Sequence, residues 1–356
     1  MKRIIFSIGL FILAPSAYAQ KTIAVLSGTN WTFYDDFSPA LRAAPAGSVI
    51  YLPGGTFTIS DGVDTINKQL TIIGVGFSMD SANATGITRL IGSLVLDNGA
   101  DYTTIEGIRI DGIGLLNGNS IYNNLFFRRC HIGSLSFAGN YSITNYGKNY
   151  YVTESVICEL NGGSVPFWGY YFYNNLKVEK SIIFGSVNGC YGSVFDNNIL
   201  NCNPNCGSCQ NNLMNGYCEF NNNIFIDSSY SFEISINSTF NNNIFRVSNS
   251  NWGNNGNVYT VCVWNKLPSA IFINPPAAGY GCDAVYNTQY NFHLKSTSPA
   301  KNFGTDGTDA GIYGTSTPCK EGWVPSNPHI SAKTIGPSSL SNGTLPVNIK
   351  VIAQDR

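Results

Sequence analysis

The sequence predicts an all-β fold, a right-handed parallel β-helix in which short strands stack coil upon coil as a solenoid. The first observation is an eight-residue window that occurs twice in nearly the same form, as CEFNNNIF at Cys218–Phe225 and as STFNNNIF at Ser238–Phe245. Looser copies of this window begin at residues 70, 103, 125, 150, 176 and 193. Most steps between copies are 17 to 26 residues, the length of one repeated supersecondary unit.

The pattern inside each window is the second observation. Apolar or small residues occupy positions 1, 3, 6 and 8, so the side chains alternate, skip two positions and alternate again. Alternation is the period of a strand. The third observation is that the segments between the windows lack runs with helical period, which argues against a doubly wound α/β sheet. Stacked parallel coils remain, and parallel crossovers are almost always right-handed.

The sixth position of the window points inward and collects asparagine in the later copies. It holds Asn198, Asn223 and Asn243 in successive coils. Because stacked coils lie about 4.8 Å apart, identical amides one above another hydrogen-bond well as a ladder. We therefore predict an internal asparagine ladder. The alternative is that these residues only serve turns.

The N-terminal residues 1–19 have the features of a secretory signal peptide. Two basic residues precede the apolar run Ile4–Leu13, and an Ala-Tyr-Ala motif stands before Gln20. The apolar run is too short to span a bilayer, and no later stretch is long and apolar enough. We expect an exported protein, secreted or held at the cell surface, with cleavage before Gln20 and no transmembrane segment afterwards. An uncleaved anchor is the alternative.

The rest of the chain is predicted as one elongated domain over residues 20–325, followed by a strand or tail over 326–356. A helix around Phe37–Ala44 is expected to cap the first coil, because a solenoid must cover the open end of its core. The net charge is −1 with 12% charged residues. This balance excludes nucleic acid as the partner, since phosphate binding needs a basic stripe. We expect a monomer.

Two end segments extend the pattern. The first is AGSVIYLPGGTFTI at Ala46–Ile59 with KQLTIIGVG at Lys68–Gly76, and the second is FHLKSTSPAKNFGTDGTDAGIYG at Phe292–Gly314. With the windows, they make residues 22–325 resemble the pectate-lyase-like right-handed parallel β-helix proteins, of an uncharacterised secreted bacterial kind. The resemblance implies the fold. It does not imply one activity, because this fold carries lyases, hydrolases, epimerases and adhesins.

The window register gathers charged residues on one face. If the protein is a lyase, Arg128 or Arg129 is the candidate base that removes a proton α to a uronate carboxylate, with His131 and Glu106 beside it. Calcium is the cofactor that such a lyase implies, but no cluster of Asp falls on adjacent coils, so no cofactor is evident. The alternative, which we favour, is an ion-pair ladder across coils. It would join Glu106 to Arg128, and Arg129 to Glu154 and Lys180; Arg109 completes the patch.

An aromatic run over residues 167–173 supplies candidate glycan-binding side chains. Exposed aromatic rings would stack on sugar faces, whereas buried ones would pack as an inner cluster, which is the interpretation we favour. The candidates are Trp168, Tyr170, Tyr171 and Tyr173.

Ten cysteines in an exported chain predict disulfides. Cys202, Cys206 and Cys209 form a compact C-x3-C-x2-C loop that disulfides would clip to the coils. A zinc knuckle that includes Cys218 is an alternative for this loop. Cys130 and Cys218 occupy inward window positions, so free buried thiols are a further alternative for these two. The pairings do not follow from the sequence.

Two more features bear on function. Asp306 and Asp309 superficially resemble the paired aspartates of polygalacturonases, but the partner motifs of those enzymes are missing, and we interpret the segment as a tight turn. The outward seventh position of the later windows is isoleucine, at residues 182, 199, 224 and 244. A wetted face does not favour isoleucine. We expect a loop or the C-terminal strand to cover this row; a partner is the alternative.

The sequence thus predicts an exported β-helix protein without a complete catalytic constellation, which binds a glycan or acts at the cell surface. A polysaccharide is the expected partner. The alternative is a carbohydrate-active enzyme, a polysaccharide lyase in preference to a glycoside hydrolase.

Overall fold

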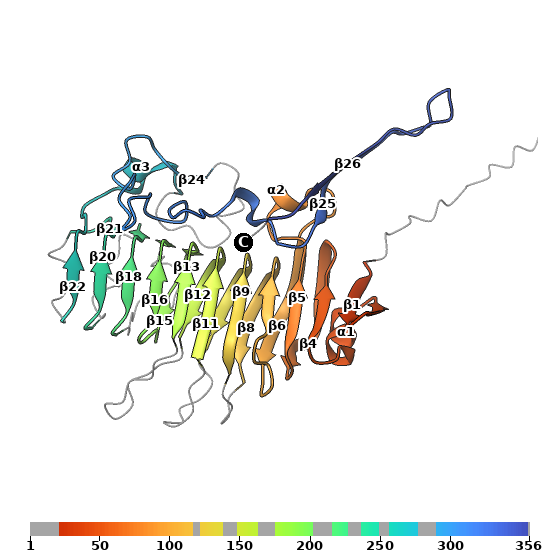
Figure 1. Ribbon diagram of the computed structural model, residues 1–356, viewed down its shortest axis with the longest axis horizontal. Coiled ribbons are helices and arrows are strands. Elements are labelled where there is room, and N and C mark those ends of the chain that lie inside the picture. Colours follow the sequence, from red (N-terminus) through yellow and green to blue (C-terminus); the bar gives the residue numbers. More distant parts are fainter. Residues whose placement is uncertain are drawn as a thin grey trace, which may run out of the picture.

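A computed structural model describes residues 21–116, 122–137, 148–162, 175–201, 216–226, 236–248, 256–276 and 290–354. Over these residues the fold is mostly β with long parallel sheets, as predicted (Figure 1). The helices are short: α1 (Phe37–Ala43), α2 (Met79–Ala82), α3 (Pro268–Ile271) and the 3-10 helix η3 (Glu321–Trp323).

Each window from Thr103 onward folds as two short strands joined by a corner, whereas the first window contains only one strand, Leu70–Ile73. In the third complete window, β9 (Asn123–Arg128) ends at its fourth position and β10 (His131–Ser136) begins at its seventh. Between them Arg129 has a φ of 47°, in the left-handed region. This corner re-aims the chain toward the second sheet, which explains why the apolar pattern skips two positions. The fifth residues of the following windows also have positive φ: Glu154, Lys180, Asn197, Asn222 and Asn242.

The chain alternates between two sheets, so one strand of the first sheet and the next strand of the second form a repeat unit. The first sheet is parallel except for β1, which pairs antiparallel with both β2 and β3. In spatial order its strands are β2 (Asn30–Tyr34), β1 (Ile23–Ser27), β3 (Ser48–Tyr51), β5 (Leu70–Ile73), β7 (Thr104–Glu106), β9, β11 (Lys148–Thr153), β13 (Leu176–Glu179), β16 (Val194–Asp196), β18 (Glu219–Asn221), β20 (Thr239–Asn241) and β22 (Val258–Thr260).

The second sheet is parallel throughout its described strands. Its order is β21 (Ile244–Phe245), β19 (Ile224–Phe225), β17 (Ile199–Leu200), β14 (Ile182–Ile183), β12 (Val156–Asn161), β10, β8 (Arg109–Leu115), β6 (Thr88–Leu96) and β4 (Gly55–Ile66), with β15 (Val187–Asn188) beside β12. The register places each window position beside the same position of the next unit. His131, for example, pairs with Arg109 on one side and with Val156 on the other.

The core lies between the two sheets and is built of stacked columns. Phe195, Phe220 and Phe240 stack in succession, with ring centroids 4.9 and 4.7 Å apart. Beside them runs the asparagine ladder, which is confirmed. Asn198 Nδ2 donates to Asn223 Oδ1 at 3.0 Å, and Asn223 Nδ2 donates to Asn243 Oδ1 at 3.1 Å. All three amides are fully buried, so the ladder satisfies polar groups that water does not reach.

Two further regions lie at the ends of the chain. The helix α1 buries Phe37 and Leu41 near β1 and β4. After the last described unit, the chain returns along the outside of the stack, and the described residues 268–276 and 290–335 are here called the return segment (Figure 1). It contains α3, the antiparallel pair β23 (Phe272–Asn274) and β24 (Asn291–Leu294), a turn-rich stretch and η3.

The last described strands form an antiparallel ribbon, β25 (His329–Ile335) with β26 (Val347–Ile352). The predicted C-terminal strand therefore exists, but it pairs with β25 and the ribbon projects away from the stack (Figure 1). Val347, Ile349 and Val351 are each more than half exposed. The ribbon is held at its base, where Ala84 N donates to Ser331 O and Gln354 N donates to Pro325 O.

Candidate functional site

The predicted charged patch is a buried ion-pair cluster. Arg129 Nε lies 2.6 Å from Glu154 Oε2, and Arg129 Nη1 lies 3.2 Å from Glu106 Oε1. All three residues are at most 9% exposed. Arg129 reaches both carboxylates because it occupies the left-handed corner between the units that carry them. We call these three residues the ionic cluster.

The return segment and the end of the ribbon cover this cluster. Ser326 donates to Glu106 through its backbone N at 2.7 Å and through Oγ at 2.9 Å, and Arg129 Nη1 donates to Gln354 O at 3.2 Å. The predicted pair of Arg129 with Glu154 is confirmed. The predicted pair of Glu106 with Arg128 is wrong, because the corner turns Arg129, not Arg128, toward Glu106.

The other two lyase candidates are separated from each other. Arg128 lies on the outer face of the first sheet, with its guanidinium carbon 5.8 Å from the centroid of the Phe126 ring. His131 is buried, packs on Phe77 and lies 3.8 Å from Cys158 Sγ through Nε2. Burial, and then the charges of Arg109 and Arg89, lower the pKa of His131 to about 3. His131 is therefore neutral at pH 7.

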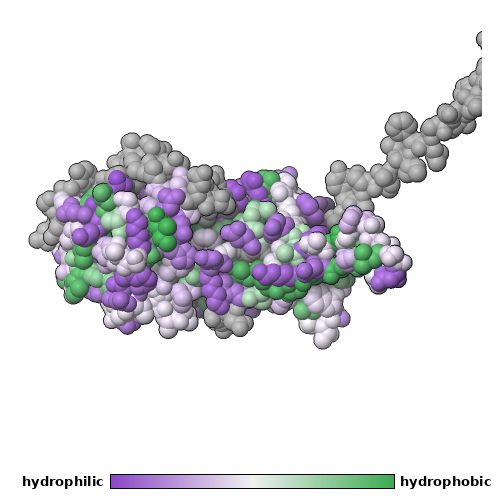
Figure 2. All heavy atoms as spheres, turned by 90° about the horizontal axis from the view of Figure 1, so that it is seen from above, coloured by the Kyte–Doolittle hydropathy of each residue, from purple (hydrophilic) through white to green (hydrophobic). Residues whose placement is uncertain are grey.

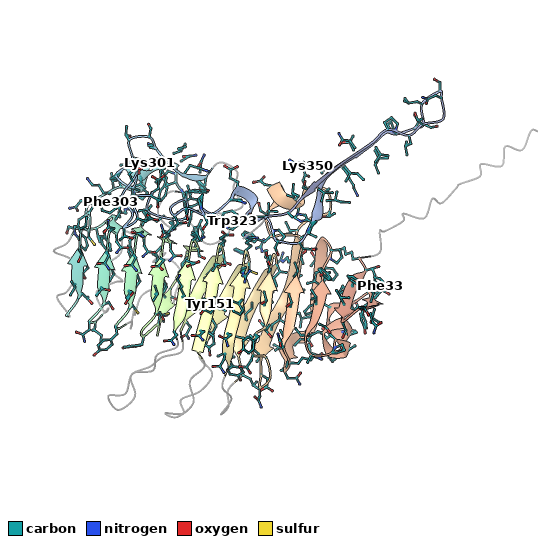
Figure 3. All side chains as sticks on the ribbon, in the orientation of Figure 1. Phe33, Tyr151, Lys301, Phe303, Trp323 and Lys350 are labelled. Atoms are coloured by element: carbon teal, nitrogen blue, oxygen red, sulfur yellow. The ribbon has the colours of Figure 1, made fainter. Side chains whose placement is uncertain are left out.

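The isoleucine row is also covered from within the chain, as predicted. Ile182, Ile199, Ile224 and Ile244 are fully buried and belong to one apolar cluster with Phe292, Ala310 and Ile312 of the return segment. Figure 3 shows Phe303 and Trp323 on the return segment, above the ends of the strands. From above, the return segment presents a mixed, largely hydrophilic surface (Figure 2).

A polar groove opens between the corners of three units and the turn-rich part of the return segment. Its volume is about 500 Å³. One wall carries the fourth and fifth window positions together with Lys177 at the second position, and the other carries the turns that follow Gly304. The groove is lined by Lys177, Glu179, Lys180, Asp196, Asn197, Asn221, Asn222, Thr305, Asp306, Thr315 and Thr317. Sequence reasoning missed this groove, although the polar columns at positions 4 and 5 were visible.

Two corner asparagines join the walls of the groove. Asn197 Nδ2 donates to Gly311 O at 3.4 Å. Asn222 Oδ1 accepts from Thr305 N at 2.8 Å, and its Nδ2 donates to Thr305 Oγ1 at 3.2 Å. Asparagine tolerates the left-handed backbone that these corners require. The same residues therefore turn the chain and fasten the return segment to it.

The rim of the groove is a line of paired charges and amides on the first sheet. Lys177 Nζ lies 2.6 Å from Glu179 Oε2 and 3.7 Å from Asp196 Oδ2. Asn221 Nδ2 donates to Asp196 Oδ1 at 2.9 Å, and Asn241 Nδ2 donates to Asn221 Oδ1 at 2.9 Å. Burial lowers the pKa of Lys177, but the hydrogen bonds and charges of Glu179 and Asp196 outweigh it and leave that pKa raised.

The paired aspartates of the GTDGTDAG segment have different surroundings. Asp309 accepts from Lys301 Nζ at 2.7 Å and from Asn302 N at 3.0 Å, so it fixes the turn. Asp306 lines the groove and accepts from Thr308 Oγ1 at 2.7 Å and Thr308 N at 3.0 Å. These hydrogen bonds lower the pKa of Asp306.

The remaining predicted residues are the aromatic run and the cysteines. Trp168, Tyr170, Tyr171 and Tyr173 lie outside the described residues, as do Cys202, Cys206 and Cys209. Of the described cysteines, Cys158 takes part in a disulfide. Cys130 and Cys218 are free and buried, as one alternative held. Cys190, Cys262 and Cys319 do not take part in disulfides either.

No group of three or more His, Cys, Asp or Glu among the described residues is arranged to hold a metal ion. Within the same ranges no helix is both long and apolar enough to cross a membrane.

Comparison with known proteins found no match for the chain: no protein-family model matches it, and no curated protein matches it either.

Proposed function

We propose that the chain is an exported right-handed parallel β-helix of the pectate-lyase-like kind, with residues 1–19 removed before Gln20 and α1 capping the first coil. The alternation of the chain between two parallel sheets supports this assignment. The burial of Phe37 and Leu41 of α1 at the start of the stack supports the cap. N-terminal sequencing of the protein recovered from the culture medium tests the export step, and a chain that starts at Met1 would contradict it.

We propose that this protein binds a glycan in the polar groove. The single observation that carries the proposal is that the groove extends across three units and is lined by carboxylates, amides, hydroxyls and ammonium groups. Sugar hydroxyls both donate and accept hydrogen bonds, and this set of side chains matches both roles. Among the described residues, no aromatic or aliphatic side chain lines the groove, so they offer nothing to an apolar ligand.

The repeat supports an extended glycan. Neighbouring strands lie about 4.8 Å apart, so the fourth-position side chains Glu179, Asp196 and Asn221 recur at that spacing along the rim. One polar side chain per strand suits a chain of sugar units laid across the strands. The hydrogen bonds from Asn221 to Asp196 and from Asn241 to Asn221 hold these side chains in place before a ligand arrives.

The ionic cluster has a structural role in this proposal. Arg129 is already hydrogen-bonded to Glu106, Glu154 and Gln354 O and is buried, so it does not present itself to a ligand. The enzyme alternative is carried by the groove instead, since Glu179, Asp196 and Asp306 bring three carboxylates to one polar space. An acid and a base carboxylate are what a glycoside hydrolase needs. Release of reducing ends from a bound glycan would establish this alternative.

The binding proposal is tested on a glycan array with residues 20–356. Asp196→Asn removes the rim carboxylate and keeps its shape, and we expect about a tenfold loss of affinity because hydrogen bonds to a charged acceptor are strong. Glu219→Gln is the matched control, because Glu219 is exposed on the next strand, beside Val194, and does not line the groove. Equal losses in both variants, or binding unchanged by Asp196→Asn, would contradict the assignment of the groove.

A further inference from the structure

The charges that line the groove do not balance. Among the described residues that line it, two lysines, Lys177 and Lys180, face three carboxylates, Glu179, Asp196 and Asp306, which leaves an excess of one negative charge. A groove built to hold a polyanion would show the opposite excess, as complementary potentials govern charged recognition.

Both lysines are already engaged. Lys177 contacts Glu179 and Asp196 on the rim. Lys180 Nζ donates to Thr317 O at 2.8 Å and to Thr317 Oγ1 at 3.2 Å, and it lies 3.9 Å from Glu154 Oε1. A ligand carboxylate would have to displace these contacts before it gained a cation.

Asp306, in contrast to the two lysines, is not engaged in an ion pair among the described residues. It stands on the wall formed by the return segment and is exposed to solvent. Its described donors are the N–H and hydroxyl of Thr308, and no lysine, arginine or histidine of the described residues forms an ion pair with it. The hydrogen bonds from Thr308 favour the charged carboxylate, so Asp306 offers a fixed anion to the groove.

We infer that the groove selects glycans whose units carry a free amino group, with the ammonium of one unit paired to Asp306. This inference rests on the proposed function and names the class of glycan. An ammonium has three donors, and Asp306 provides the charged acceptor, while Asn197, Asn221 and the threonine hydroxyls of the groove serve the neutral hydroxyls. A uronate polysaccharide, the class that the lyase alternative requires, would bring its carboxylates toward three carboxylates of the protein.

The inference is tested with three hexasaccharide probes: β-1,4-linked glucosamine, its fully N-acetylated form and α-1,4-linked galacturonate. Calorimetric titration at a mildly acidic pH, where the amino groups carry protons, should give about tenfold tighter binding of the glucosamine hexamer than of the acetylated hexamer. Raising the salt concentration should weaken the first and leave the second nearly unchanged, because the Asp306 pair is exposed and screened.

The matched variants are Asp306→Asn and Asp61→Asn. An asparagine at 306 keeps an oxygen for Thr308, so the turn survives while the charge is lost. We expect this variant to bind the two glucosamine-based hexamers equally well. Asp61 is an exposed aspartate far from the groove, with a φ of 57° that asparagine also adopts, so Asp61→Asn should retain the preference.

The results separate the two proposals. Equal binding of the glucosamine and acetylated hexamers, a preference that survives Asp306→Asn, or tightest binding of the galacturonate hexamer would each overturn the inference. If that happens while Asp196→Asn still weakens binding of an array glycan about tenfold, the proposed function stands without the inference. If no probe binds and no array glycan depends on Asp196, both are overturned.

Discussion

The return segment covers an ionic surface over the middle units and an apolar surface over the last ones. Over the middle units it meets the ionic cluster of Glu106, Arg129 and Glu154, with Ser326 supplying hydrogen bonds. Over the last units it packs Ala310 and other apolar residues on the isoleucine row, which is the seventh window position, whereas the ionic cluster occupies the fourth and fifth. The residue at the seventh window position changes along the stack, from His131 through Val156 to the isoleucines.

The difference between these two surfaces explains how the return segment is both attached to the stack and aligned with it. Apolar packing is non-directional and roughly proportional to the area buried, so the isoleucine row binds the segment without specifying its register. The ionic cluster needs named partners at hydrogen-bond distance, and it fixes which residues of the segment lie over which unit. Losing one partner of the ionic cluster costs more stability than losing one apolar contact, because the buried charge that remains has neither its partner nor water.

Removing the central charge should give the largest effect. Arg129→Ala leaves the carboxylates of Glu106 and Glu154 buried without the cation that lies between them, and we expect a loss of about 3–5 kcal/mol in the free energy of unfolding. Urea denaturation followed by circular dichroism measures this loss. The triple replacement of Arg129, Glu106 and Glu154 by apolar residues should recover much of it. A single variant within 1 kcal/mol of the unaltered protein would show that the cluster is not buried.

A large-to-small change in the isoleucine row comes next. Ile224→Ala opens a cavity under the return segment, and we expect a loss of about 2–4 kcal/mol. Val258→Ala is the control, because Val258 is 55% exposed on the edge strand β22, and it should change stability by less than about 0.5 kcal/mol. Equal effects at the two positions would mean that the row faces water.

His131, where the ionic and apolar halves meet, predicts a pH dependence. Its pKa is about 3 in the folded protein and about 6.5 when unfolded, so below pH 6.5 the unfolded chain binds the extra proton. Stability should therefore fall as the pH drops from 6.5 toward 3, by up to about 1.4 kcal/mol per pH unit. Unfolding free energies at pH 7, 6 and 5 measure this slope. His131→Leu should flatten it, and an unchanged slope in that variant would assign it to other groups.

An exposed ion pair completes the series with the smallest effect. Lys177 and Glu179 lie 2.6 Å apart, as close as Arg129 and Glu154, but the lysine side chain is 40% exposed. We expect Lys177→Met to cost only about 0–1 kcal/mol, since water screens the pair. Thermal unfolding of this variant beside Arg129→Ala separates the contribution of burial from that of distance. A loss comparable to that of Arg129→Ala would remove the basis of the comparison.

Several features of the fold were predictable because they depend on local periodicity. Side-chain direction follows the strand period, so the windows placed Asn198, Asn223 and Asn243 in one inward column and the isoleucines in one outward row. The partner of Glu106 was not predictable in this way. The left-handed corner at Arg129 rotates the fifth position out of simple alternation, and the pairing of Glu106 with Arg128 rested on alternation alone.

The groove is a clearer case of a feature that local periodicity does not predict. Glu179, Asp196 and Asn222 could be assigned to the outer corner of their units from the windows, but Thr305 and Asp306 follow them by more than 80 residues. Only the path of the return segment brings the two walls together.

The sequence by itself determined the repeat, its register and the inward and outward columns, because each of these depends on the backbone period within a few residues. The tertiary structure alone decided that the ionic cluster is covered and that a polar groove exists. Both depend on where a segment distant in sequence comes to rest, and that position is set by many weak contacts acting together rather than by any local pattern.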